Sequence, residues 1–310
     1  MTPFIVSLVF MVVVVGAIVA GLESERCQPG HFTRLLLRGR REPVHQGRRL
    51  AEWLEDLSIQ ELFQLQRADG LPHEPSDKYI RAAEAIRQIG PKAVPCLVAL
   101  IRNPHRHWEL RVERLFTGRQ QFDHQLSCLH SNVDQAFEVL GEVAKDAIPQ
   151  LAELLRTSAA RAAAAALGGI GLAALPELTQ ALDHPDRHVR SGAAAAINRI
   201  GLAALPAASA LLKCLHDEYP LVSFWSASAL SKMGGHLDEA VRVLADLALV
   251  DDSVISPGAL LELMRLGQEA KAAVPTLLKS LESSKSESHE LAKAALKAID
   301  PAAAASAGLQ

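Results

Sequence analysis

The sequence predicts an all-α protein, a right-handed solenoid of about six or seven helical hairpins that is preceded by one transmembrane helix. Hydrophobic residues make up 49% of the 310-residue chain, but aromatic residues only 4%. Alanine, leucine, valine and isoleucine must therefore form the core, which suits closely packed helices better than sheets. The phrase IGLAALP occurs twice, at 170–176 and at 200–206, and this indicates a repeated structural unit. The third observation is an uncharged apolar stretch near the N-terminus.

That apolar stretch, residues 4–22, reads FIVSLVFMVVVVGAIVAGL. As a helix it would extend about 28 Å, which is close to the thickness of the hydrocarbon core of a membrane. The alternative is a cleaved signal peptide, with Ala17, Ala20 and Gly21 near the cleavage site. Signal peptides usually begin with a basic region, and residues 1–3 contain no Lys or Arg. We expect residues 1–22 to form a retained transmembrane anchor.

Basic residues follow the predicted span and none precedes it. They are Arg26, Arg34, Arg38, Arg40, Arg41, Arg48 and Arg49. The positive-inside rule then places the C-terminal part in the cytoplasm, and a periplasmic or secreted location after signal cleavage is the alternative. Residues 23–46 are expected to form a basic juxtamembrane linker. Its run RLLLRGRR either contacts anionic lipid headgroups or is a solvated flank.

Glycine and proline recur at fixed spacing through the rest of the chain. The short form of the pattern is GPKAVP at 90–95 and GLAALP at 171–176 and 201–206, and the long form is GEVAKDAIP at 141–149 and GQEAKAAVP at 267–275. Alanine-rich amphipathic runs precede each copy, and leucines at helical spacing follow it. The glycine is expected to end a first helix in a left-handed conformation, and the proline to lie in the first turn of a second helix. Each copy is therefore the corner of a helical hairpin, and residues 76–310 form a stacked array.

The segments between hairpins carry matching signals. Residues 182–201 align without gaps on residues 215–234. The matched apolar pairs are Val189 with Val222, Ile197 with Leu230, and Ile200 with Met233. Asp186 and Ser256 are expected to cap the N-termini of their helices.

This pattern resembles the short HEAT-type repeats, including the phycobilisome-lyase-like variety. The best match comprises Asp186, Val189, Arg190, Ala193, Ala194, Ile197, Ile200, Gly201, Ala204 and Pro206. The layout is similar to membrane-anchored bacterial HEAT-repeat proteins, in which a short G-x-x-L-x-x-W-L motif precedes the array. Here that motif is Gly47, Leu50, Trp53 and Leu54. Three departures are Ser223 in place of the usual Arg, Arg242 near an expected Pro, and Asp300 in place of the last Gly.

Two segments are expected to modify the array. Residues 47–75 are predicted to contain a helix that caps the open end of the first repeat. Residues 103–131 read as an insertion between the first two repeats, and such insertions form loops that often determine binding specificity.

Catalytic and metal-binding patterns are weak. The insertion contains His105, His107, His124, Cys128 and His130, which we interpret as solvated polar residues because no CxxC or HExxH supports a zinc site. The pair His289–Glu290 resembles the His–Glu dyads of deoxyhypusine hydroxylase, a HEAT-repeat di-iron enzyme. The matching positions of other repeats hold Tyr79, Arg190 and Ser223, so the dyad does not recur. We expect no cofactor, no metal and no catalytic residue. The buried thiols of Cys96 and Cys214 are expected to be structural.

The charge distribution argues for a protein or peptide partner and against nucleic acid. The net charge is −3, and the position four residues after each proline reads Ala99, Glu153, Gln180, Ala210 and Lys279. A nucleic-acid groove would need repeated Lys or Arg along the second helices. We expect the second helices to line the concave face and to bind the partner there. The candidate residues are Gln150, Glu153, Glu177, Gln180, Lys213 and Lys279.

The favoured function is therefore a non-catalytic, membrane-anchored scaffold for protein–protein interaction. The resemblance to lyase-type repeats implies an alternative, a lyase-like or protein-modifying enzyme or an enzyme subunit. A purely structural component of the cell envelope is a third possibility that shares the same fold.

Overall fold

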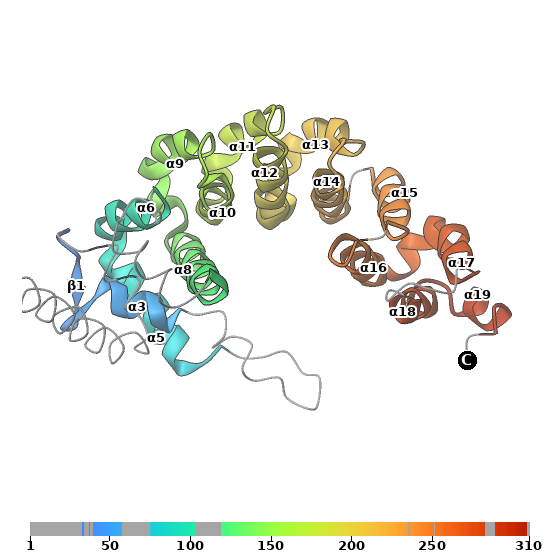
Figure 1. Ribbon diagram of the computed structural model, residues 1–310, viewed down its shortest axis with the longest axis horizontal. Coiled ribbons are helices and arrows are strands. Elements are labelled where there is room, and N and C mark those ends of the chain that lie inside the picture. The colour runs from blue at the N-terminus through green and yellow to red at the C-terminus, as the bar shows by residue number, and fades with distance from the viewer. Residues whose placement is uncertain are drawn as a thin grey trace, which may run out of the picture. The chain divides into compact units, whose positions relative to one another are not determined.

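A computed structural model describes Thr33, Leu37 and residues 40–57, 75–102, 119–234, 236–250, 252–282 and 289–308. The chain divides into two compact units, Met1–Val139 and Leu140–Gln310, which we describe separately. Apart from one short pair of strands, every regular element in these residues is helical (Figure 1). The all-α prediction is confirmed.

In its described residues, the first unit contains a β-hairpin and one helical hairpin. Its elements are β1 (Val44–His45), β2 (Arg48–Arg49), α3 (Leu50–Asp56), α5 (Asp77–Ile89), the 3-10 helix η1 (Gly90–Ala93), α6 (Val94–Arg102) and α8 (Arg119–Leu140). The strands are antiparallel, with Val44 opposite Arg49 and His45 opposite Arg48. Gly47, the first residue of the G-x-x-L-x-x-W-L motif, lies in their turn. The last three motif residues are buried in α3.

The segment around α3 covers the first helical hairpin. The Trp53 indole donates to the carbonyl oxygen of His45 at 3.3 Å, and the Arg48 guanidinium lies 4.0 Å from the centre of the Trp53 ring. The Asp56 carboxylate accepts from Arg48 at 2.8 Å and pairs with Lys78 of α5 at 3.3 Å. These contacts join α3 to α5, and the role of residues 47–75 as a cap stays a prediction. They also show that ordered structure begins before Gly47, because β1 belongs to the segment predicted as a linker.

The predicted insertion is shorter than expected. Helix α8 begins at Arg119, so residues 119–131 belong to a regular helix that continues without a break to Leu140. Residues 119–131 were predicted to belong to a loop because they are mostly polar. An amphipathic helix with one solvated face can have the same composition. The earlier part of the insertion, residues 103–118, lies outside the described residues.

The second unit is an array of helical hairpins. Its elements are η2 (Gly141–Ala147), α9 (Ile148–Leu154), α10 (Ala160–Ile170), η3 (Leu172–Ala174), α11 (Leu175–Ala181), α12 (Arg187–Ile200), η4 (Gly201–Ala207), α13 (Ala208–Cys214), α14 (Pro220–Met233), α15 (Leu237–Leu247), α16 (Ile255–Leu266), η5 (Gly267–Ala273), α17 (Val274–Glu282), α18 (His289–Ile299) and α19 (Pro301–Ser306). Each helix packs on its neighbours along the array, as α10 does on α12 and α12 on α14. The predicted solenoid is confirmed, and its right-handed sense stays a prediction.

Within this unit the helices form two layers (Figure 1). Helices α10, α12, α14, α16 and α18 lie in the inner layer of the curved array, and we call them the inner helices. Helices α9, α11, α13, α15 and α17 lie in the outer layer, and we call them the outer helices. In every hairpin from α10–α11 to α16–α17, the first helix is therefore inner and the second is outer.

The corner glycines adopt a conformation more restrictive than predicted. Gly171 has φ 89° and ψ −143°, and Gly201 has φ 70° and ψ −138°. The positive φ was predicted, but these ψ values lie far from those of the left-handed helix, which are near +47°. They resemble the first central residue of a type II′ turn, where glycine is preferred. Pro149, Pro176 and Pro275 lie in the first turn of their helices, as expected.

The inner helices approach one another closely because their contact residues are small. A Cβ atom added to Gly168 of α10 would lie 3.1 Å from the Cα atom of Ala196 in α12, and one added to Gly192 would lie 3.1 Å from the Cβ atom of Ala164. Larger residues fill the space between layers, and the matched pairs Val189 with Val222 and Ile197 with Leu230 are buried. Cys96 and Cys214 are buried as predicted, and burial raises the pKa of the Cys214 thiol to about 11.

The two predicted helix caps have different outcomes. Asp186 caps α12, because its carboxylate accepts from the backbone N–H of His188 at 2.8 Å. The prediction for Ser256 is wrong. Its hydroxyl is buried and donates to the carbonyl oxygen of Ala248 at 2.8 Å. The Asp252 carboxylate instead accepts from the backbone N–H groups of Val254, which precedes α16, and Ile255, its first residue.

Arg190 connects two successive repeats through a nearly buried guanidinium, and only 9% of the residue is exposed. It donates to both carboxylate oxygens of Asp217, at 2.7 and 2.9 Å, and to Glu218 at 3.2 Å. It also donates to the carbonyl oxygens of His184 and Pro185. One side chain therefore joins the turn before α12 to the turn before α14.

The predicted transmembrane segment, residues 4–22, lies outside the described residues. Within the described part of the chain, Arg187–Cys214 is the one stretch long and apolar enough to cross a membrane by length and composition. This stretch is not one straight helix, because it comprises α12, η4 and α13 and turns at Gly201. It forms a repeat of the array.

Candidate functional site

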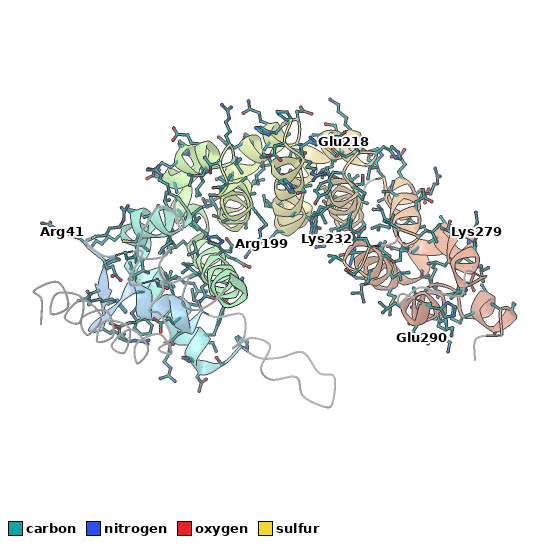
Figure 2. All side chains as sticks on the ribbon, in the orientation of Figure 1. Arg41, Arg199, Glu218, Lys232, Lys279 and Glu290 are labelled. Atoms are coloured by element: carbon teal, nitrogen blue, oxygen red, sulfur yellow. The ribbon has the colours of Figure 1, made fainter. Side chains whose placement is uncertain are left out.

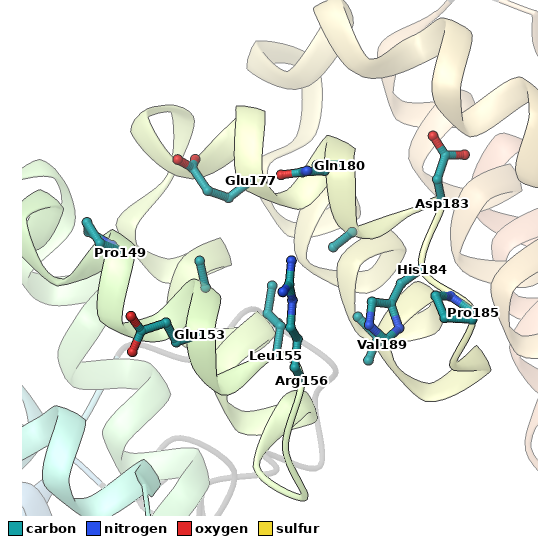
Figure 3. Close-up of a pocket in the computed structure, with 12 residues that line it drawn as sticks. Pro149, Glu153, Leu155, Arg156, Glu177, Gln180, Asp183, His184, Pro185 and Val189 are labelled. Atoms are coloured by element: carbon teal, nitrogen blue, oxygen red, sulfur yellow. The ribbon is translucent and has the colours of Figure 1, made fainter.

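The outer layer of the second unit contains an open groove of about 570 Å³. Helices α9 and α11 and the turn between α11 and α12 form its walls (Figure 3). The lining residues are Pro149, Ala152, Glu153, Leu155, Arg156, Glu177, Gln180, Ala181, Asp183, His184, Pro185 and Val189. We call this site the outer groove. It lies between two short helices of consecutive repeats, α9 and α11. Residues of the turns that follow these helices also line it.

The sequence analysis found part of the outer groove. Three of the six predicted binding residues, Glu153, Glu177 and Gln180, line it. Gln150 is exposed on α9 but does not line the groove, and Lys213 and Lys279 are exposed on α13 and α17. The prediction that these residues lie on a concave face is wrong, because the second helices form the outer layer of the array (Figure 1). Whether they bind a partner stays a prediction.

Three polar residues of the outer groove were missed. Arg156 follows α9, and Asp183 and His184 follow α11. The predicted residues lie within the second helices, whereas these three lie in the turns that follow those helices. A signal was available, since both turns carry charged residues directly after the last leucines of the helix, in ELLRT and ALDHP.

The polar groups of the outer groove are mainly hydrogen-bond acceptors. Glu153, Glu177 and Asp183 contribute three carboxylates, against the one guanidinium of Arg156 (Figure 3). The Oε2 atom of Glu177 is buried and makes no hydrogen bond to the described part of the protein. Unpaired buried acceptors favour a donor from a ligand. The groove is therefore suited to a cationic or donor-rich group of a partner.

The rest of the lining is apolar or fixed by local contacts. Leu155, Pro185 and Val189 provide the apolar part. The Nδ1 atom of His184 accepts from the backbone N–H of Asp186 at 3.1 Å, so this imidazole presents its other nitrogen, Nε2, as a donor. A pocket that combines apolar walls with a few polar groups is typical of a binding site.

No described group of three or more His, Cys, Asp or Glu side chains has a geometry that could hold a metal ion. His105 and His107 and the side chain of His124 lie outside the described residues. Glu290 of the His289–Glu290 pair accepts from Lys293 at 2.8 Å, which is an ordinary contact between neighbours on one helix.

The stacked hairpins and the open groove between them define an α-solenoid repeat protein. Residues 148–231 match the model of the HEAT-repeat family, so this part of the array is similar to HEAT repeats. The match begins in α9 and ends in α14, and it includes both the outer groove and the Arg190 contact. The predicted resemblance to HEAT repeats is confirmed.

One solved structure with a TM-score above 0.5 supports the same fold. It is the complex in which Kap95p binding induces the switch loops of RanGDP to adopt the GTP-bound conformation, with a TM-score of 0.51 at 15% sequence identity. The similarity covers 93% of this chain and 40% of that chain, so our protein spans less than half the length of its structural neighbour. An engineered protein of 18% identity gives a TM-score of 0.28, over 83% of this chain and 97% of that chain. No curated protein matches the sequence.

Proposed function

We propose that the protein is a non-catalytic, membrane-anchored HEAT-repeat scaffold that binds a protein or peptide partner. The observation that carries this proposal is the outer groove, which is open, mixed in polarity and formed by two consecutive repeats. A repeat array alone supports only a shape, and the groove adds a site of definite chemistry. The structural neighbour in which Kap95p binds RanGDP is a precedent for partner binding on such a fold.

A photo-crosslinking experiment in native membranes tests partner binding. A photoreactive amino acid replaces Gln180 in the outer groove, and a matched protein carries it at Lys279 on α17, which does not line the groove. We expect a specific adduct from position 180 and none of the same mass from position 279. The double variant Glu153→Lys/Glu177→Lys should abolish the adduct, whereas Lys213→Glu should preserve it. A persistent adduct in the double variant would contradict a role for the groove.

The membrane part of the proposal rests on the sequence of residues 4–22 and is tested separately. We expect the full chain to remain in the membrane fraction after alkaline extraction, and a variant lacking residues 4–22 to become extractable. Protease treatment of spheroplasts tests the orientation. Protection of the repeats supports the cytoplasmic location that the flanking arginines favour, and digestion supports the periplasmic alternative.

The lyase-like alternative makes a different prediction about the purified protein. An enzyme of that kind would carry a chromophore or a metal, or would transfer one. Absorption spectra and metal analysis of the full chain in detergent test it. We expect a colourless protein without stoichiometric metal, and a bound chromophore or metal would favour the enzyme.

A further inference from the structure

Three basic residues occupy equivalent positions on adjacent inner helices. Arg199 of α12, Lys232 of α14 and Arg265 of α16 each lie two residues before the glycine that ends the helix. All three residues are exposed. Figure 2 shows Arg199 and Lys232 at the inner edge of the array, while Lys279 of α17 lies on its outer side. We call the three residues the basic row.

The basic row belongs to a layer with little negative charge. Helices α10, α12 and α14 contain no Asp or Glu. In α16, Glu262 is the one acidic residue, and its carboxylate accepts from Arg265 at 2.8 Å. The outer helices carry both signs, with more acidic residues (Glu153, Glu177, Asp238, Glu239, Asp246 and Glu282) than basic ones (Lys213, Arg242 and Lys279). The net charge of the whole chain is −3, whereas α12 and α14 carry basic but no acidic residues.

Hydrogen bonds between the inner helices hold the basic row in place. Ser228 of α14 donates to Asn198 of α12 at 3.2 Å, directly beside Arg199. Arg265 of α16 donates to the Ser231 hydroxyl of α14 at 2.8 Å, directly beside Lys232. These two bonds fix the relative positions of α12, α14 and α16 along their axes. They therefore set the spacing of the backbone positions from which the three basic side chains extend.

The surface beside the basic row has an apolar part. Trp225 lies seven residues before Lys232 in α14, and residues at this spacing lie on the same face of a helix. The Trp225 ring is half-buried and contacts Phe224, with ring centres 4.8 Å apart. The matching positions on the neighbouring helices are Gly192 and Gly258. A Cβ atom added to Gly258 would lie 3.0 Å from the Phe224 ring, so Phe224 of α14 occupies the space that this glycine leaves.

We propose that the inner face of α12, α14 and α16 binds an acidic segment of a protein partner in the polyproline II conformation. This inference rests on the proposed scaffold role and adds a second binding surface, distinct from the outer groove. Packed helix axes lie about 8–10 Å apart. Polyproline II has three residues per turn and rises about 3.1 Å per residue, so every third side chain points the same way at intervals of about 9 Å. Carboxylates at every third position would therefore meet Arg199, Lys232 and Arg265 in turn.

The length of the basic row favours a peptide over a nucleic acid. The equivalent positions on the flanking helices are Gly169 of α10 and Ala298 of α18, so the charge ends after three repeats. Nucleic-acid binding needs many phosphate contacts to be strong at physiological salt. A short acidic peptide with three carboxylates at the right spacing needs only three basic residues to pair with them.

Two peptides of identical composition test the proposal with the full chain in detergent. The first has the sequence Glu-Pro-Pro-Glu-Pro-Pro-Glu, which places all carboxylates on one face of a polyproline helix. The second, Glu-Pro-Glu-Pro-Glu-Pro-Pro, distributes them over three faces. Fluorescence anisotropy of labelled peptides gives the affinities. We expect the first peptide to bind at least about fivefold more tightly, and its binding to weaken as salt rises from about 50 to about 300 mM.

Charge-reversal variants locate the site. We expect Lys232→Glu to weaken binding of the first peptide by about fivefold or more, and Arg199→Glu/Lys232→Glu to weaken it further. Lys232→Arg should retain binding. Lys213→Glu makes the same change on an outer helix and should alter the affinity less than twofold. Circular dichroism establishes that each variant is folded, and Arg265 is left unchanged because it also bonds Ser231 and Glu262.

Equal binding of the two peptides, equal effects of the inner and outer variants, or tighter binding of a single-stranded oligonucleotide that depends on the same residues would each overturn the inference. The experiments distinguish failure of this inference from failure of the proposed function. If the crosslink at position 180 forms but the acidic peptide does not bind, the scaffold proposal stands and the inner-face proposal fails. If neither occurs, both fail.

Discussion

The corner glycines hold a backbone conformation that other residues adopt with strain. Gly201 has φ 70° and ψ −138°, and a Cβ atom added there would meet nothing within 4 Å. The obstacle to substitution is therefore the backbone conformation and not a lack of space. Gly168 differs, because its added Cβ atom would lie only 3.1 Å from Ala196 and would make a tight contact there.

We predict that Gly201→Ala lowers the free energy of unfolding by about 1–3 kcal/mol, because an L-residue is strained at these angles. Asparagine tolerates the left-handed helical region but should not rescue this position, since ψ differs. Urea denaturation followed by circular dichroism measures the change. The control is Leu202→Ala at the next residue, which is 67% exposed and should change stability by less than about 0.5 kcal/mol. Equal effects of the two substitutions would contradict the strain argument.

We predict that Arg190→Ala lowers the free energy of unfolding by about 3 kcal/mol. Removal of one partner from a buried pair leaves the Asp217 carboxylate without its compensating charge, and this is strongly destabilising. The control is Arg187→Ala on the same helix. Arg187 is exposed and lies over the Tyr219 ring at 4.9 Å, so its loss should change stability by no more than about 1 kcal/mol. Denaturant titration of the two variants compares them directly.

The stabilisation that Arg190 provides should depend on pH. Desolvation raises the pKa of Asp217, but the hydrogen bonds from Arg190 and the Tyr219 backbone N–H and the charge of Arg190 outweigh it, so that the pKa is lowered. A lowered folded-state pKa gives stability that is complete above the unfolded-state pKa, near 3.9, and is lost as pH falls through the folded-state value.

The difference in unfolding free energy between the natural protein and Arg190→Ala should therefore be constant between about pH 5 and pH 7 and should decrease below about pH 4. Denaturant titrations over this range measure it. A difference that stays constant down to about pH 3 would show that the carboxylate of Asp217 is not the important partner.

Residues that act locally could be predicted, and residues that act across repeats could not. Asp186 caps the helix that begins at the next residue, and its role follows from sequence position alone. Arg190 matched the HEAT pattern, but its main partner, Asp217, lies 27 residues away. A single sequence does not indicate which residue of the next turn contacts Arg190. Ser223, which replaces the Arg in the following repeat, keeps a weaker contact to the Asp217 carbonyl oxygen at 3.4 Å.

At the scale of elements, small residues determine how closely the inner helices approach. Gly168 of α10 faces the backbone of Ala196 in α12, and Gly192 faces the Cβ atom of Ala164. The inner helices are therefore close enough for neighbouring repeats to share polar contacts such as Ser228 with Asn198. Alanine in these runs is a packing residue as well as a helix former.

We predict that Gly168→Leu lowers the free energy of unfolding by about 2 kcal/mol or more, because the added side chain must displace backbone atoms of α12. The control, Ala165→Leu, adds a side chain of similar size on the same helix at a position that is only half-buried. It should change stability by less than about 0.5 kcal/mol. Thermal unfolding followed by circular dichroism measures both. A larger effect at Ala165 would contradict the assignment of the contact face.

The hairpins were predictable because glycine and proline act over a few residues, but the layer that each helix occupies was not. Which helices line the inside of a curved array depends on small rotations summed over many repeats. The same reasoning explains why only Glu153, Glu177 and Gln180 of the outer groove were found. Arg156, Asp183 and His184 reach the groove from turns, whose path follows from the packing of two repeats.

At the scale of the whole molecule, the second unit is held together by contacts between neighbours. Helix α10 packs on α9, α11 and α12, and α18 packs on α16, α17 and α19. In an array of this kind, stability is approximately a sum of the stabilities of the repeats and the interfaces between them. Local unfolding should therefore begin at a weakened repeat and extend only to its neighbours.

Two substitutions of the same type at opposite ends of the second unit test this expectation. Leu167 of α10 and Leu296 of α18 are both fully buried, and replacement of either by alanine should lower the local free energy of unfolding by about 2–5 kcal/mol.

We predict that Leu296→Ala accelerates amide hydrogen exchange in α16–α19 and leaves exchange in α10 unchanged, because several helices separate α18 from α10. Leu167→Ala should give the opposite pattern, with faster exchange in α9–α12 and unchanged exchange in α18. In a globule with one shared core, each substitution would accelerate exchange throughout, since global unfolding would then be the common route to exchange. That outcome for either variant would contradict the one-dimensional architecture on which the groove, the basic row and the proposed scaffold role all depend.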